Sequence, residues 1–123
     1  MTDNATMTIS ELAKAIITLA SEKNVMLVLA ESCTGGMIAA TLTDIAGSSA
    51  VIDRSLVTYS NQAKQDLLGV SDDILAGYGA VSAETAIAMT TGALLKTPAS
   101  RRRRQAPFGC DAARNRFPAA SPP

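Results

Sequence analysis

Ser32 is the side chain in this sequence best placed to act as a nucleophile. It follows an apolar run of strand length, residues 25–30, and is followed by Gly35, Gly36 and a helical segment. A strand, a turn of small residues and a helix bring polar side chains and backbone amides to the carboxyl edge of a sheet. Amides there can stabilise an oxyanion or hold a phosphate. Ser32 needs a base, however, and the sequence contains no histidine.

Lys64 is our candidate for that base. Ser60 has the side chain of a helix N-cap, which places Lys64 in about the first turn of the helix that follows. The helix dipole and burial both disfavour the ammonium form at such a position, and a lysine must be neutral to act as a base. Tyr59 ends the preceding strand and could relay a proton. From spacing alone, a surface lysine and a strand-end tyrosine remain the alternative.

Cys33 is a rival nucleophile in the same turn, because a helix N-terminus also activates a thiol. The alternative interpretation of Cys33 is a small buried side chain that only fills space in the core. The other cysteine, Cys110, is far away in the sequence and without CxxC spacing, so a zinc site is not expected. Ser71, Asp72 and Asp73 fit helix capping better than metal binding. We therefore expect neither a metal nor a cofactor.

The hydrophobic pattern predicts an α/β protein. Residues 25–30 are continuously apolar, which is typical of a strand covered by helices on both faces of a parallel or mixed sheet. A second strand is predicted over 51–59. Helices are predicted over the following ranges: 9–23, with Thr8 and Glu11 as a capping box, 37–45, 61–68, 72–76 and 83–96. In the last of these, the buried side is expected to hold Ala86, Met89, Ala93 and Leu94.

Composition divides the 123 residues into two unlike segments. Residues 1–100 contain five basic and ten acidic residues, a net charge of −5, whereas residues 101–123 contain six arginines and one aspartate, a net charge of +5. The second segment has no Val, Ile, Leu or Met and cannot form a core. We expect one domain over 1–100 and a disordered tail over 101–123, whose composition is that of a shifted reading frame. Without a long apolar run or a signal peptide, the predicted location is the cytoplasm.

Five segments carry a family resemblance. They are AESCTGG (30–36), IAGSS (45–49), VTYSNQAK (57–64), LGV (68–70) and GAVS (79–82). Over about residues 8–100 the sequence resembles the nicotinamide-nucleotide amidohydrolase family, the C-terminal domain of competence/damage-inducible protein A. The family also occurs as a stand-alone enzyme, and with no room for the larger N-terminal domain this chain resembles that form.

The resemblance implies a three-layer α/β/α sandwich with a mixed sheet, here incomplete. It also implies deamidation of nicotinamide mononucleotide to nicotinate mononucleotide and ammonia. By the family's pattern Ser32 would be the nucleophile, Lys64 the base and Tyr59 the proton relay. The residues implied near the substrate or the oxyanion are Thr34, Gly35, Gly36 and Ser48. Nicotinamide mononucleotide is then the expected partner. A homo-oligomer is possible under this resemblance, and we expect neither a nucleic acid nor a membrane as a partner.

The sequence also departs from the family. Members continue after the helix near Lys96 with a buried strand, a TGIAGP-type loop, further strands and an arginine, none of which is found here. A truncated, marginally stable and self-associating member with little activity is therefore expected. The competing interpretations are an inactive or non-catalytic nucleotide-binding or interaction module, and a nucleic-acid-binding protein. The second is disfavoured because residues 1–100 are acidic and the tail offers only Phe108 and Phe117 for stacking.

Overall fold

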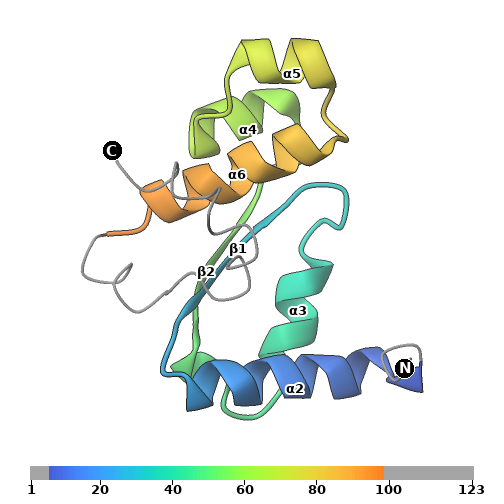
Figure 1. Cartoon of the computed structure of the whole chain (residues 1–123), viewed down its shortest axis with the longest axis vertical. Helices are drawn as coiled ribbons and strands as arrows, with labels where there is room; N and C mark the ends of the chain where they lie inside the picture. The colour runs from blue at the N-terminus through green and yellow to red at the C-terminus, as the bar shows by residue number, and fades with distance from the viewer. Residues whose placement is uncertain (1–5, 99–123) are drawn as a thin grey trace.

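The computed structural model describes residues 6–98 and confirms an α/β architecture (Figure 1). Every helix and strand expected from the sequence in this range is present, with its ends displaced by two residues or fewer. A short 3-10 helix, η1, was not expected. In chain order the elements are α2 (Ile9–Glu22), β1 (Leu27–Glu31), α3 (Met37–Thr43), η1 (Ser48–Ala50), β2 (Ile52–Val57), α4 (Asn61–Leu68), α5 (Asp72–Tyr78) and α6 (Ala83–Leu95). The predicted tail, 101–123, lies outside the described residues.

The two strands are parallel neighbours in one sheet. Their register runs from Leu27 opposite Ile52 to Glu31 opposite Val57, with an irregularity just after Leu27. Parallel strands need a crossover, and α3 with η1 supplies it. Both strands therefore end at the same edge of the sheet. The mixed sheet implied by the resemblance would need an antiparallel strand, and residues 6–98 contain none.

Helices cover both faces of this sheet, which gives three layers (Figure 1). Alternate residues of a strand point to opposite faces, so each face has its own core. One core joins α2, α3 and the start of β2 through buried Ala13, Ile17, Ala20, Val25, Leu42 and Val51. The other joins α4, α5 and α6 through buried Leu68, Val70, Leu75, Met89 and Ala93.

Helix α6 lies unusually close to the end of α4. A Cβ atom added to Gly92 would lie 1.9 Å from the carbonyl oxygen of Leu68, so this approach requires glycine. Met89 and Ala93 are buried as expected, but Ala86 is exposed. Thr85 occupies the buried position instead, because its hydroxyl donates a 2.6 Å hydrogen bond to the carbonyl of Gly79.

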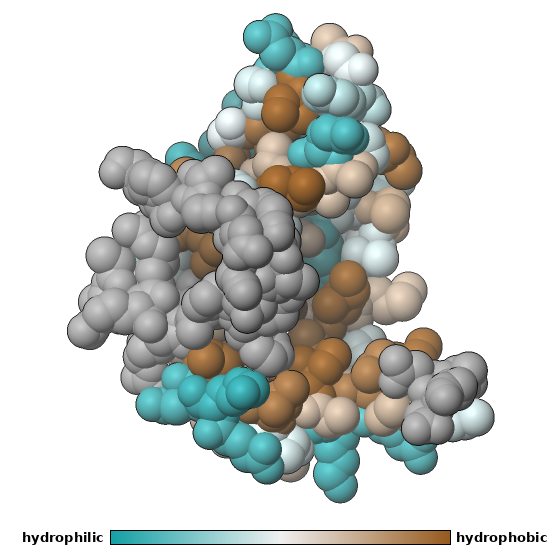
Figure 2. Space-filling model, viewed as in Figure 1, coloured by the Kyte–Doolittle hydropathy of each residue, from teal (hydrophilic) through white to brown (hydrophobic). Residues whose placement is uncertain are grey.

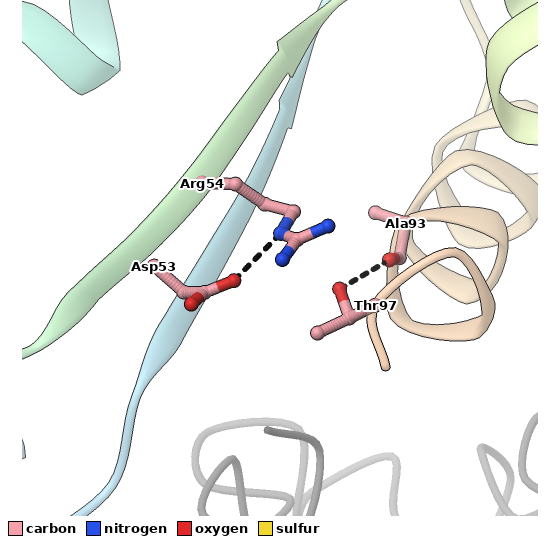
Figure 3. A network of polar contacts seen from close by, with 4 residues as sticks. All are labelled: Asp53, Arg54, Ala93 and Thr97. Carbon is pink, nitrogen blue, oxygen red and sulfur yellow. Dashed lines mark hydrogen bonds and ion pairs between the residues drawn. The ribbon is translucent and has the colours of Figure 1, made fainter. Parts of the chain in front are cut away.

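Near its C-terminal end, α6 faces polar groups of β2. Figure 3 shows the guanidinium of Arg54 extending from β2 toward this end of the helix. Arg54 Nε lies 2.6 Å from a carboxylate oxygen of the neighbouring Asp53. On the helix side, the hydroxyl of Thr97 donates to the carbonyl of Ala93 at 2.9 Å.

The α2–α3 side leaves several apolar side chains uncovered. Figure 2 shows hydrophobic side chains gathered in the lower part of the view, where α2 and α3 lie. The exposed apolar residues of these two helices are Ile9, Leu12, Leu19, Met37 and Ile38. A groove between the helices is lined by Ile9, Ser10, Met37, Ala40, Thr41 and Asp44. Among residues 6–98, no helix is long and apolar enough to cross a membrane.

Candidate active site

Ser32 and Lys64 meet at the carboxyl edge of the sheet, although they come from different turns. The Ser32 hydroxyl donates to the carbonyl oxygen of Tyr59 at 3.4 Å, and Lys64 Nζ donates to the same oxygen at 3.0 Å. Ser32 follows β1 and Lys64 lies in the helix after β2, so the parallel sheet brings the two turns together. The Ser32 hydroxyl and the Lys64 amine therefore converge on one backbone acceptor.

Lys64 is almost fully enclosed by the protein, with an exposed fraction of 1%. Ser60 is the N-cap of α4 and accepts a hydrogen bond from the amide of Ala63, which fixes the first turn that carries Lys64. Besides the Tyr59 carbonyl, Nζ reaches the carbonyl of Ser60 at 3.5 Å. Two backbone carbonyls therefore accept hydrogen bonds from the Lys64 amine.

Tyr59 contributes its backbone carbonyl, rather than its phenol, to the contact with Ser32 and Lys64. Its side chain is 72% exposed, and its hydroxyl makes no hydrogen bond to either residue. The preceding Thr58 is fully buried and fixes the strand end, because its amide donates to the carbonyl of Glu31 at 2.8 Å. The carbonyl of Tyr59 is thus held in place by the sheet.

Glu31 is a residue that the sequence interpretation did not single out. It ends β1, is only 2% exposed, and its carboxylate accepts four hydrogen bonds. These come from the Thr34 hydroxyl at 2.6 Å and from the amides of Gly36, Ile38 and Ala39 at 3.1, 3.1 and 2.8 Å. Gly36 is the N-cap of helix α3 and has no side chain with which to cap it. The available sequence signal was a carboxylate at the end of an apolar strand, a few residues before a helix whose N-cap is a glycine.

The hydrogen bonds also set the charge of Glu31. Burial raises its pKa, but the bonds from Thr34, Ala39, Ile38 and Gly36 outweigh burial, so the pKa of this carboxyl lies below its ordinary value. Glu31 is therefore a buried anion at neutral pH. Its negative charge lies against the start of α3, where the backbone amides carry partial positive charge.

Acceptors of the protein itself take the two glycine amides that a substrate oxyanion was expected to use. The amide of Gly36 donates to Glu31, and the amide of Gly35 donates to the carbonyl of Ser32 at 2.9 Å. Both glycines have positive φ, +61° and +109°, which explains their occurrence in this turn. Thr34 also borders Ser32, but its hydroxyl is bonded to Glu31.

Ser48 lies away from this edge. It belongs to η1, which immediately precedes β2, whereas Ser32 lies beyond the opposite ends of the strands. Its buried hydroxyl donates to the carbonyl of Thr43 at 3.2 Å. Cys33, by contrast, is in the Ser32 turn and is exposed with a free thiol. No group of three metal-ligating side chains occurs among residues 6–98.

The fold and the site together define a class of protein: an α/β/α domain that brings a serine and a buried lysine to one edge of its sheet. The chain belongs to the CinA C-terminal domain family, whose profile it matches over residues 9–101. It is 45% identical over 94 residues to the nicotinamide-nucleotide amidohydrolase PncC of Escherichia coli K12, covering 76% of this chain and 55% of that protein. A PncC from Enterobacter agglomerans is 62% identical over 65 residues, 53% of this chain and 40% of that one.

Solved structures agree with this assignment. A competence/damage-inducible protein from Agrobacterium tumefaciens matches with a TM-score of 0.69 and 56% identity, covering 72% of this chain and 53% of that one. A CinA superfamily protein from Escherichia coli matches with a TM-score of 0.72 and 34% identity, covering 79% and 55%. The chain thus spans about half the length of these solved relatives. It is also 57% identical over 79 residues to a CinA-like protein from Geobacter sulfurreducens, of which it covers 19%.

Proposed function

We propose that this chain hydrolyses the carboxamide of nicotinamide mononucleotide, giving nicotinate mononucleotide and ammonia. The observation that carries the proposal is that the Ser32 hydroxyl and the Lys64 amine both donate to the Tyr59 carbonyl. The substrate class comes from the relatives named nicotinamide-nucleotide amidohydrolase. No histidine is present to serve as an alternative base for Ser32.

In the proposed first step, Ser32 Oγ attacks the carboxamide carbon while its proton passes to Lys64 Nζ. The 3.4 Å bond from Ser32 to Tyr59 is long, so the hydroxyl can leave it at little cost. Collapse of the tetrahedral intermediate breaks the carbon–nitrogen bond, and the proton held by Lys64 leaves with ammonia. Water then hydrolyses the acyl-serine ester by the same route in reverse, with Lys64 accepting and returning the proton.

The remaining residues take supporting roles in this proposal. The exposed phenol of Tyr59 relays a proton once a bound substrate draws it toward Ser32. Thr34, Gly35 and Gly36 border the bound carboxamide because they flank Ser32 in the same turn. For Ser48, the resemblance remains the only support for a substrate contact, because it lies at the other edge of the sheet.

The test is ammonia release from nicotinamide mononucleotide by the full 123-residue chain. We expect a low rate, since the chain spans about half the length of the PncC relative from Escherichia coli, but one that Ser32→Ala abolishes and Cys33→Ala leaves unchanged. Loss of the rate in Cys33→Ala alone would move the nucleophile to Cys33. If the chain releases no ammonia but nicotinamide mononucleotide perturbs the amide resonances of residues 32–36, a non-catalytic nucleotide-binding module is the correct interpretation.

A further inference from the structure

The carboxylate of Glu31 fixes the turn on one side of Ser32. Its Oε1 atom accepts from Thr34, Gly36 and Ile38, and its Oε2 atom accepts from Ala39. All four donors lie after Ser32 in the chain, whereas Glu31 itself precedes Ser32. The turn that presents the hydroxyl is therefore closed into a loop by one buried side chain.

The main chain of Glu31 fixes the other turn. Its carbonyl oxygen accepts from the amide of Thr58 at 2.8 Å and from the Thr58 hydroxyl at 3.4 Å. The next residue, Tyr59, supplies the carbonyl that Ser32 and Lys64 share. Glu31 is thus bonded on one side to the turn of the nucleophile and on the other to the strand end that holds the base.

We propose that Glu31 is a positioning residue that sets the distance between the Ser32 hydroxyl and the Lys64 amine. The inference rests on the proposed function for its kinetic consequence, but its structural consequence can be measured independently. We do not assign Glu31 a catalytic role, because both oxygens of its carboxylate already accept hydrogen bonds from the protein. A displacement of about 1 Å at a reacting group can cost about 100-fold in rate.

Glu31→Gln changes one of the four bonds and preserves size. The glutamine oxygen can still accept from Thr34, Gly36 and Ile38, but its NH₂ group then faces the amide donor of Ala39. Glu11→Gln is the matched control. The Glu11 carboxylate also accepts a backbone amide at a helix start, from Thr8 at 2.9 Å, but it is exposed and belongs to α2.

In steady-state kinetics with nicotinamide mononucleotide, we expect Glu31→Gln to lower kcat by about 10- to 100-fold. KM should change by no more than about threefold, because substrate contacts are not removed. Glu11→Gln should leave both constants unchanged. An unchanged kcat in Glu31→Gln, or a loss confined to KM, would overturn the positioning role.

Amide hydrogen exchange separates this proposal from the proposed function. We expect Glu31→Gln to speed exchange at Ala39 and at Thr58 while the amides of α6 exchange as in the parent protein. Faster exchange at Ala39 with unchanged exchange at Thr58 would mean that Glu31 caps α3 only, which overturns the proposal. If the parent protein releases no ammonia, the proposed function fails, and the exchange result alone decides the role of Glu31.

Should Glu31→Gln fail to fold, Thr34 offers a milder pair. Thr34→Val removes only the 2.6 Å hydroxyl donor, and Thr34→Ser restores it. The positioning role predicts faster exchange at Thr58 in Thr34→Val and parent-like exchange in Thr34→Ser. Equal exchange in both variants would contradict it.

Discussion

The turns that follow β1 and β2 are held in opposite ways. After β1, a buried anion gathers hydrogen-bond donors, since Glu31 accepts from one hydroxyl and three amides. After β2, a buried amine gathers acceptors, since Lys64 donates to the carbonyls of Tyr59 and Ser60. Helix α3 depends on Glu31 for its cap, whereas α4 has its own cap in Ser60.

The difference is one of chemical polarity, because one turn is organised around a buried acceptor and the other around a buried donor. The bonds to Glu31 occupy both of its oxygens and stabilise its charged form, so it has little left to exchange with a substrate. Lys64 instead donates to two backbone carbonyls, one of which it shares with Ser32. Both side chains are buried, and burial alone would not have distinguished them.

The largest expected effect comes from moving α4, and with it Lys64, relative to the rest of the site. Gly92→Ala places a methyl group 1.9 Å from the Leu68 carbonyl at the end of α4. We expect the free energy of unfolding to fall by about 3 kcal/mol, because overpacking outweighs the better helix propensity of alanine. Urea denaturation measures this change.

Gly77→Ala is the control for helix propensity. Gly77 lies in α5, and nothing lies within 4 Å of an added Cβ there. Its free energy of unfolding should stay the same or rise by up to about 1 kcal/mol. Equal effects of the two substitutions would show that α6 does not press on α4.

An intermediate effect is expected from the anionic turn, and it should depend on pH. Burial raises the pKa of Glu31 but its hydrogen bonds lower it further, so the folded-state pKa lies below the ordinary value of 4.5. A carboxyl with a depressed folded pKa adds stability above its unfolded pKa, and that stability disappears as pH falls through the folded value. At pH 7, Glu31→Gln should reduce the free energy of unfolding by about 2 kcal/mol.

The difference between the parent protein and Glu31→Gln should shrink as pH is lowered from 7 toward 3. A protonated carboxyl resembles the glutamine amide, since each then has one donor and one acceptor group. Urea denaturation at several pH values provides the measurement. A difference that stays constant over this range would contradict an ionised Glu31 in the folded state.

The smallest effect is expected at the capped start of α4. Ser60→Ala removes the acceptor of the Ala63 amide and should reduce the free energy of unfolding by about 1 kcal/mol. Ser71→Ala removes the equivalent cap of α5, where the Ser71 hydroxyl accepts from the Ile74 amide. It should reduce the free energy of unfolding by a similar amount. Only Ser60→Ala should also lower kcat, because only α4 carries Lys64. Equal kinetic effects would mean that neither cap matters to the site.

The sequence predicted the elements well because apolar spacing and helix caps are local signals. Thr8 with Glu11, Ser60 and Ser71 each cap a helix where they were expected to. It failed where a polar group is satisfied through space. Thr85 is buried in place of Ala86 because it reaches the Gly79 carbonyl, which hydrophobicity does not reveal.

The candidate site shows the same division. The order strand, turn, helix predicted Ser32 at the carboxyl edge of a sheet. Its pairing with Lys64 came from the family resemblance, because spacing alone left a surface lysine as the alternative. The place of Glu31 at the end of an apolar strand was visible in the sequence, but its four hydrogen bonds were not, since they depend on the path of the turn over Gly35 and Gly36. For the same reason, the glycine amides were predicted to be available when the folded turn uses them.

A double-mutant cycle on Ser32 and Lys64 tests the central claim most directly. The rate of ammonia release from nicotinamide mononucleotide would be measured for the parent chain, Ser32→Ala, Lys64→Ala and the double variant. If the two groups act as a unit at the Tyr59 carbonyl, each single variant should lose about as much rate as the double variant. Additive losses, or a Lys64→Ala variant that retains the parent rate, would contradict the account.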